Sequence, residues 1–295
     1  MRLKKFEFFS PPSLKEALQL LGQFGTPSRL IAGGTDLVVQ MKNKLVAPAK
    51  VISLLNIPDL HGLAKKGGEL RIGALVQHAL LEDSPLLKNG WTILSAAAKK
   101  IGSPQIRWLG TLGGNLCNAS PSADTAPPLL VLEAQVNLVS PRGNRRLPLD
   151  SFFLGPGLTI LERDEILQEI FIPEAPPNSQ GTYLKLGRRK SLDLALVSVA
   201  ILLTLSADKI TCQRARVALG GVAPTPRRAK ETEKILAGQA LEENVIQQAG
   251  EMAQRECCPI SDIRASAEYR REMVRVLMER AIKKLLGQPI PPTGI

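Results

Sequence analysis

Two glycine pairs, each set among hydrogen-bond donors, constrain the fold of this 295-residue chain more than any other feature. The first, Gly33-Gly34, follows a short apolar strand over residues 29–32 and precedes a helical stretch to about residue 43. The second, Gly113-Gly114, lies within the segment 110–115. Glycine lets backbone N–H groups approach an anion without a Cβ in the way. One such pair is also common as a simple turn, whereas two in one chain indicate a dinucleotide held across two lobes.

The residues beside the glycines add candidate ligands. Thr35 and Asp36 are placed to cap the helix that follows the first pair. A polar run over residues 118–125 follows the second pair, and its Asp124 can accept hydrogen bonds from ribityl or ribose hydroxyls. The sequence contains neither G-x-G-x-x-G after the first strand nor G-x-x-x-x-G-K-[ST], which argues against a Rossmann domain and a P-loop.

Helical and strand patterns alternate along the whole chain, which predicts an α+β protein. A capping box from Ser13 to Glu16 begins the first helix, and the first 55 residues form a small βα-type unit. The proline-rich stretch 173–179 predicts a linker without regular ladders. The other expected strands are 50–54, 69–73, 135–140, 145–149, 166–172, 183–187, 197–205 and 215–220, and the expected longer helices are 92–101 and 267–286.

The net charge of +11 raises nucleic acid as a partner. Against it, the basic residues occur in scattered short groups, such as Arg145-Arg146 and Arg227-Arg228, and the chain has only seven Phe, two Tyr and two Trp for stacking on bases. A basic surface also suits an acidic protein or a phosphate-bearing cofactor. The charge alone does not decide among these partners.

The four cysteines form no C-x-x-C, and the two histidines are far from any Cys or acidic cluster. We therefore expect free thiols and no metal site. The N-terminal residues carry no apolar signal segment, and the longest uncharged apolar stretch, 194–207, is too short to span a bilayer. A cytoplasmic location is the expectation.

Several motifs, taken in order, resemble one known family. They are Ala32 to Leu37, Ile101 to Arg107, Gly110 to Asn115 and Ala119 to Pro127, continued by Asp150 to Gly157, Leu167 and Tyr183 to Arg189. Together they resemble the FAD-binding medium subunit of the xanthine dehydrogenase and carbon monoxide dehydrogenase (molybdenum hydroxylase) family. The resemblance covers nearly the whole chain and is far more specific than either glycine pair.

The resemblance implies an FAD-binding domain of the vanillyl-alcohol-oxidase (PCMH) type over residues 1–175, in two lobes of about 1–55 and 56–175. It implies a smaller C-terminal α+β domain, an antiparallel sheet with helices, over residues 180–288. Residues 289–295 are expected to be a loose tail.

The same resemblance assigns residues to the cofactor. The pyrophosphate would lie on Ala32, Gly33, Gly34, Thr35 and Asp36 and on Thr111, Leu112, Gly113, Gly114 and Asn115. Asp124 would hold the ribityl or pyrophosphate region. Ile101, Leu167 and Lys185 would lie near the flavin ring, with Lys185 as a donor to a ring carbonyl. Without the resemblance, Ile101 and Leu167 would be interpreted as core residues and Lys185 as a solvated strand residue.

Two departures from the family pattern stand out. Trp108-Leu109 stands where the family commonly has Asn-Arg, which removes a charge beside the second loop. Members with an extra iron–sulfur cluster carry a cysteine-rich insertion, whereas only Cys117 lies in this region. We therefore expect no cluster in this chain.

The implied function is that of an electron-transfer subunit with non-covalent FAD and no catalytic side chain of its own. Its partners would be a small subunit with two [2Fe–2S] clusters and a large subunit with the molybdopterin cofactor, with NAD or another molecule as electron acceptor. A self-contained flavin oxidoreductase on the same fold is the first alternative, although the chain offers few His or Tyr for catalysis. A basic module that binds nucleic acid or an acidic protein is the second.

Overall fold

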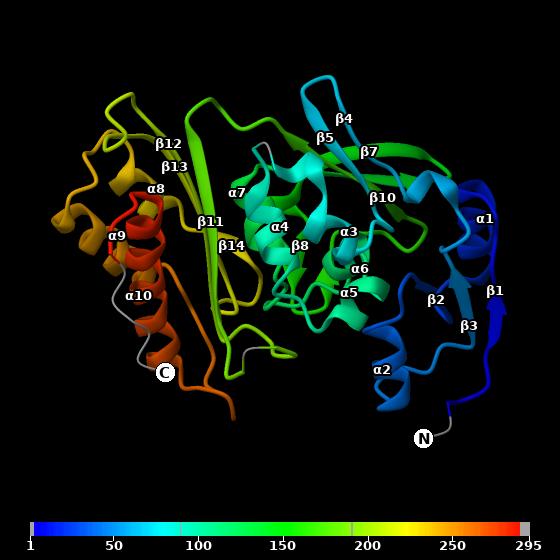
Figure 1. The fold of residues 1–295 in the computed structure, drawn as a ribbon. Helices are drawn as coiled ribbons and strands as arrows, with labels where there is room; N and C mark the ends of the chain where they lie inside the picture. The colour runs from blue at the N-terminus through cyan, green and yellow to red at the C-terminus, as the bar shows by residue number, and fades with distance from the viewer. Residues whose placement is uncertain (1–2, 89, 190, 290–295) are drawn as a thin grey trace.

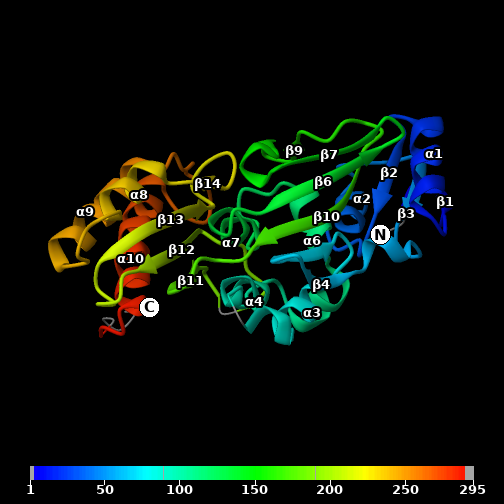
Figure 2. The same cartoon turned by 90° about the horizontal axis from the view of Figure 1, so that it is seen from above.

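The structure, a computed structural model, describes residues 3–88, 90–189 and 191–289. Three sheets follow one another in space from the N-terminal to the C-terminal end of the molecule (Figure 1). The view from above shows the same succession (Figure 2). Helices pack against each sheet, as the α+β prediction requires. Among the described helices, none combines the length and the apolar character that crossing a membrane would need.

The first sheet is parallel and has the order β1-β3-β2. Its elements are β1 (Glu7–Phe9), α1 (Leu14–Phe24), β2 (Ser28–Ile31), α2 (Leu37–Lys42) and β3 (Lys50–Ser53). The Ser13 half of the predicted capping box is confirmed, because the Ser13 hydroxyl accepts from the Glu16 N–H. The Glu16 carboxylate accepts from the Ser13 hydroxyl rather than from a backbone N–H, so the reciprocal half differs from the prediction. The apolar stripe of α1 covers the sheet, and β2 ends where the first glycine pair begins.

The second sheet has five antiparallel strands in the order β4-β5-β10-β6-β7. The strands are β4 (Leu63–Lys66), β5 (Glu69–Gly73), β6 (Gln135–Ser140), β7 (Gly143–Pro148) and β10 (Ile166–Pro173). The predicted hairpin is confirmed, with a tighter turn than expected because Gly143 already pairs with Ser140. Beside this sheet lie a two-stranded hairpin, β8 (Phe153–Gly155) with β9 (Leu158–Thr159), and short 3-10 turns at Pro58–Leu60, Pro85–Lys88 and Leu149–Ser151.

Five helices accompany the second sheet and carry the second glycine pair. They are α3 (His78–Asp83), α4 (Thr92–Ala98), α5 (Pro104–Leu109), α6 (Leu112–Cys117) and α7 (Ala126–Val131). Helix α4 ends three residues before the predicted end at residue 101. Residues 99–101 continue as tight turns, with the N–H groups of Lys100 and Ile101 bonded to the carbonyls of Ala97 and Ala98, and Gly102 follows with a φ of 46°.

The third sheet has the order β11-β12-β13-β14, antiparallel throughout. It comprises β11 (Ser179–Leu186), β12 (Val197–Leu205), β13 (Cys212–Gly220) and β14 (Arg227–Arg228), followed by α8 (Lys230–Leu236), α9 (Glu243–Arg255) and α10 (Ala267–Leu285). The predicted linker 173–179 is too long, because Pro173 pairs with Glu69 and Ser179 pairs with Thr204. A proline at a strand end forfeits no interior ladder bond, so the prolines did not mark the limits of the connection.

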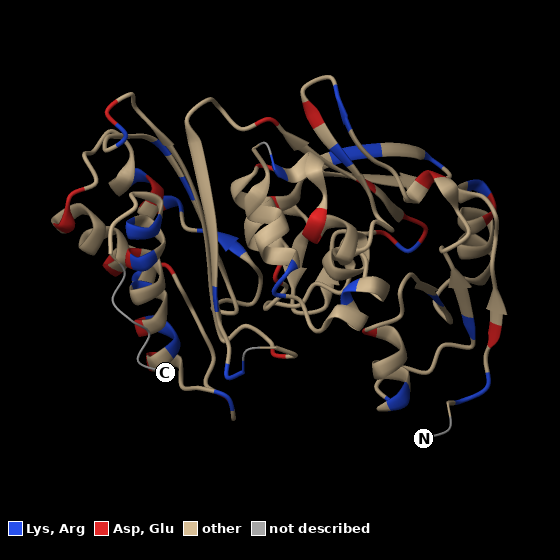
Figure 3. Cartoon of the chain, in the orientation of Figure 1, with Lys and Arg blue, Asp and Glu red and all other residues tan. Residues whose placement is uncertain are grey.

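Charged segments lie on all three sheets and on α10 rather than gathering in one stripe (Figure 3). This distribution agrees with the scattered basic pairs in the sequence. In this view the Lys and Arg positions of the described residues alternate with Asp and Glu positions along the elements.

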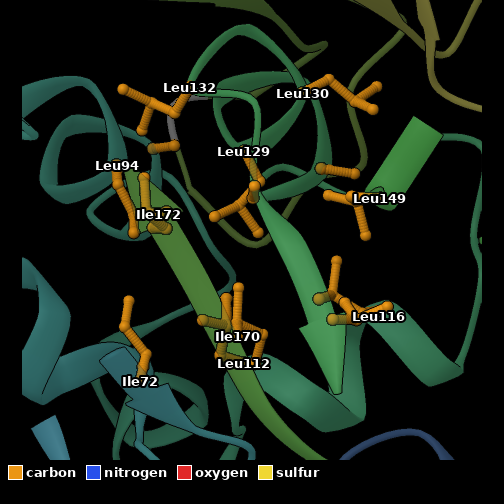
Figure 4. Packing of buried hydrophobic residues seen from close by; sticks show 14 of the residues in the cluster. Ile72, Leu94, Leu112, Leu116, Leu129, Leu130, Leu132, Leu149, Ile170 and Ile172 are labelled. Atoms are coloured by element: carbon orange, nitrogen blue, oxygen red, sulfur yellow. The ribbon is translucent and has the colours of Figure 1, made fainter. Parts of the chain in front are cut away.

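The third sheet has apolar residues on both of its faces. On β12, Ala200 and Leu202 belong to the large core that also contains the second sheet and its helices, whereas Val199 and Ile201 belong to a separate core with α8–α10. Alternate side chains of a strand point to opposite faces, which explains this division. Figure 4 shows part of the large core, with Ile72, Ile170 and Ile172 of the second sheet and Leu94, Leu112 and Leu129 of the helices.

Candidate functional site

A cavity of about 950 Å³ lies where the first sheet meets the helices of the second. This volume is at the upper end of the range for small-molecule sites. Its lining includes twelve of the fourteen residues predicted to bind the cofactor: Ala32, Gly33, Gly34, Thr35, Asp36, Ile101, Thr111, Gly113, Gly114, Asn115, Asp124 and Leu167. Leu112 and Lys185 are not in the lining.

The first loop, residues 32–36, leaves the end of β2 and leads into α2. In the described part of the chain, the N–H groups of residues 33–36 donate to no protein acceptor, whereas the Val38 N–H already bonds the Gly34 carbonyl. Gly34 has a φ of 70°, which a side chain would disfavour. Successive N–H groups of this kind form a concavity that suits an anion such as a phosphate.

Gly33 is the point where the two loops touch. A Cβ added at Gly33 would lie 1.7 Å from the carbonyl oxygen of Leu109 and 3.1 Å from the nitrogen of Gly110. Any residue with a side chain would therefore push the first loop away from the segment that leads into the second. Close backbone approach explains this glycine.

The second loop forms a wall of the cavity, but most of its donors are used inside the protein. The N–H groups of Leu112 and Gly113 donate to the carbonyls of Val76 (2.9 Å) and Ala74 (2.8 Å), and the Gly114 N–H donates to the Thr111 hydroxyl (3.1 Å). The expectation of several free donors here is therefore corrected. The Leu112 side chain is fully buried in the large core, so its predicted place at the cofactor is not supported by its position.

Asn118 links the two loops and was not predicted as a site residue. Its amide nitrogen donates to the Asp36 carboxylate at 3.2 Å, and its amide oxygen accepts from Gln40 at 3.3 Å. Asp36 makes no cap bond with α2, contrary to the expectation, and Thr35 makes none. Burial raises the pKa of Asp36. Position in the sequence could not reveal this contact, because Asn118 lies 82 residues from Asp36.

Asp124 is a buried carboxylate held by two residues of β11. Tyr183 donates to one oxygen at 2.6 Å, and the Lys185 ammonium donates to the other at 2.7 Å and to the carbonyl of Lys100 at 3.0 Å. Burial raises the pKa of Asp124, and the contacts with Lys185 and Tyr183 oppose this rise. The Lys185 side chain is only 8% exposed, so it is not a solvated strand residue. It does not belong to the cavity lining either.

Ile101 and Leu167 lie on the apolar part of the lining, together with Ile106, Leu161 and Ile166. Leu167 belongs to the large core as well, and β10 has an irregularity between Leu167 and Glu169. Leu167 therefore packs in the core and also lines the cavity, so both interpretations describe its position.

The comparisons with known proteins decide the family. Residues 4–175 match the model of the FAD-binding domain in molybdopterin dehydrogenase, and residues 182–285 match that of the carbon monoxide dehydrogenase flavoprotein C-terminal domain. The chain belongs to the FAD-binding medium subunits of the molybdenum hydroxylase family.

Individual relatives agree along nearly their whole length. The chain is 35% identical over 278 residues to the carbon monoxide dehydrogenase medium chain of Hydrogenophaga pseudoflava, covering 94% of this chain and 96% of the relative. It is 36% identical over 282 residues to the nicotine 6-hydroxylase medium subunit of Paenarthrobacter nicotinovorans, covering 96% and 98%. The solved carbon monoxide dehydrogenase from Hydrogenophaga pseudoflava that lacks the Mo-pyranopterin moiety contains a chain with a TM-score of 0.94, 34% identity and coverage of 97% and 99%.

This medium subunit is therefore an oxidoreductase component whose cofactor is FAD. Its described residues contain no group of three or more His, Cys, Asp or Glu side chains that could hold a metal ion. Cys117 lies in the cavity lining, where burial raises the pKa of its thiol to about 12, so it is a protonated thiol at neutral pH.

His78 is a lining residue of the medium subunit that no sequence pattern indicates as part of the site. Its side chain is 2% exposed, and its ring lies beside Gly110 between the two loops. Burial and the nearby Arg107 lower the pKa of His78 to about 4, so the imidazole is neutral at pH 7.

Proposed function

We propose that FAD binds non-covalently in the cavity between the two loops, with its diphosphate on the N–H groups of residues 33–36. The observation that carries this proposal is the row of N–H groups that have no acceptor among the described residues, beside a glycine that close backbone contact explains. Asn115 adds amide donors, since Thr125 bonds only its oxygen, at 2.6 Å. The donor set and the cavity volume thus fit an elongated anionic cofactor.

The apolar part of the lining suits the flavin ring. Ile101 and Leu167 would exclude water from it, and Asp124 would face the polar chain that joins ring and diphosphate. Lys185 would act on the same polar chain through Asp124, because it fixes the charge and the position of that carboxylate. FAD supplies the electron-transfer chemistry, and these residues orient it and set its surroundings.

We further propose that the subunit receives electrons from the [2Fe–2S] clusters of a small partner subunit and passes them to NAD or another acceptor. A large subunit with the molybdopterin cofactor would oxidise the substrate. The names of the relatives, medium chain and medium subunit, support a component of a complex over a self-contained flavin oxidoreductase. The net charge of +11 would favour association with acidic partner surfaces. We place this complex in the cytoplasm.

The substrate is set elsewhere in the complex. A carbon monoxide dehydrogenase chain and a nicotine 6-hydroxylase chain resemble this chain equally, at 35% and 36% identity. Because relatives named for such different substrates are equally similar in sequence to this chain, the comparison supports a medium subunit that does not select the substrate.

An absorption spectrum of the purified chain, and of its complex, before and after acid precipitation tests the cofactor. We expect bands at ~370 and ~450 nm that stay in the supernatant, as a non-covalent flavin requires. A complex without flavin would refute the proposal, and colour that stays with the precipitate would refute non-covalent binding.

A further inference from the structure

We infer that His78 is a further cofactor-binding residue, whose Nε2 donates a hydrogen bond to an oxygen of the FAD diphosphate. The inference rests on the proposed position of FAD in the cavity. It assigns a role to a side chain that forms part of the wall and has no hydrogen-bond partner within residues 3–88, 90–189 and 191–289.

The two ring nitrogens of His78 have different surroundings. Nδ1 is enclosed by protein and has no hydrogen-bond partner among the described residues. Nε2 is not among the enclosed unpartnered atoms, and no protein hydrogen bond reaches it either. Since the side chain lines the cavity, Nε2 is the nitrogen that opens into it.

The backbone holds the ring at the junction of the two loops. The His78 N–H donates to the Gly110 carbonyl at 3.1 Å, and a Cβ added at Gly110 would lie 3.5 Å from His78 Nε2. The same Leu109–Gly110 backbone is the segment that Gly33 touches. His78 and Gly33 therefore contact the same short backbone segment, and both line the cavity proposed for the diphosphate.

The charge state of the ring suits a donor. Arg107 stays close but is engaged, because its Nε bonds Glu82 at 2.6 Å and its Nη1 bonds the Ile101 carbonyl at 3.0 Å. The imidazole is neutral at pH 7 and carries one N–H, so the tautomer with the proton on Nε2 offers that proton to the cavity. A hydrogen bond from a neutral donor to a phosphate oxygen is charge-assisted and stronger than a neutral pair.

The test compares the FAD affinity of His78→Leu, His78→Gln and His61→Gln with that of the wild type, by flavin fluorescence in the full chain or in its complex. Leu is close to His in size and has no donor, whereas Gln places an amide N–H near the position of Nε2. We expect roughly 10- to 100-fold weaker binding for His78→Leu, and a smaller loss for His78→Gln. His61 is the control, because it does not line the cavity and its Nε2 already contacts the Leu55 carbonyl at 2.9 Å.

A second readout separates binding from structure. Since His78 and His61 are the only histidines, ¹⁵N-histidine NMR of the full chain shows two imidazoles, which the His61→Gln variant assigns. We expect FAD to shift the His78 nitrogen signals and to leave those of His61 in place. FAD bound with wild-type affinity by His78→Leu, or an unmoved His78 signal, would overturn this inference and leave the FAD site intact. A wild type that binds no FAD, alone or in its complex, would instead overturn the proposed function.

Discussion

Replacing His78 by Leu should remove a large part of the pH dependence of folding stability. In the unfolded chain the imidazole has its ordinary pKa of 6.5, whereas burial first and Arg107 second lower it to about 4 in the folded chain. Between these two values the unfolded chain binds more protons, so the free energy of unfolding falls as the pH falls. The contribution is complete above pH 6.5 and is lost progressively toward pH 4.

The size of the effect follows from the two pKa values, which differ by roughly 2.5. At 1.36 kcal/mol for each pH unit, His78 alone should cost the wild type about 2 kcal/mol of stability between pH 7 and pH 5. Urea unfolding of the FAD-free full chain at both pH values measures this loss. His78→Leu should lose about 2 kcal/mol less than the wild type, and His61→Gln should behave like the wild type. Equal losses in the wild type and in His78→Leu would refute a buried, neutral imidazole.

The remaining predictions concern the contact between the loops and the buried carboxylate. Gly33→Ala should separate the two loops and lower FAD content sharply, because its Cβ would meet a backbone oxygen at 1.7 Å. Gly22→Ala in helix α1, where a Cβ meets nothing within 4 Å, should bind FAD normally and gain up to about 1 kcal/mol of stability. Asp124→Ala should weaken FAD binding and also lower the free energy of unfolding by about 3–5 kcal/mol, since it leaves the Lys185 ammonium buried without its partner. Adding Lys185→Met should recover much of that stability, and no recovery in thermal unfolding would argue against the ion pair.

The sequence predicted local features of the fold well, because they depend on residues near one another. The helix cap at Ser13, the strands and the turn of the β6–β7 hairpin each follow from a pattern within a few residues. The limits of the connection after β10 were missed, since pairing of Pro173 and Ser179 depends on strands more than twenty residues away. Helix and strand ends are decided by such partners.

The site shows the same division. In the first loop, the N–H groups of residues 33–36 have no acceptor in the part of the chain that the structure describes, as the glycines indicated. The second loop has a similar sequence, yet carbonyls of Ala74 and Val76, from the chain between β5 and α3, accept its N–H groups. Lys185 likewise donates to the carboxylate of Asp124, which lies 61 residues away in the sequence and comes close only in the folded chain. The sequence pattern could not predict which polar groups have hydrogen-bond partners far away in the chain.

The third sheet has a consequence for the order in which a growing chain can become a finished subunit. One face of β12 and β13 completes the core beneath the cavity, and the Gly221 N–H donates to the carbonyl of Pro121 in the polar run beside Asp124 at 2.7 Å. The cofactor pocket therefore stays unfinished on the ribosome until about three quarters of the polypeptide has emerged, although all its predicted loop residues are made much earlier. A ribosome that stops at residue 175 would release a chain with the glycine loops present and an apolar face uncovered, a species prone to aggregate rather than to bind flavin.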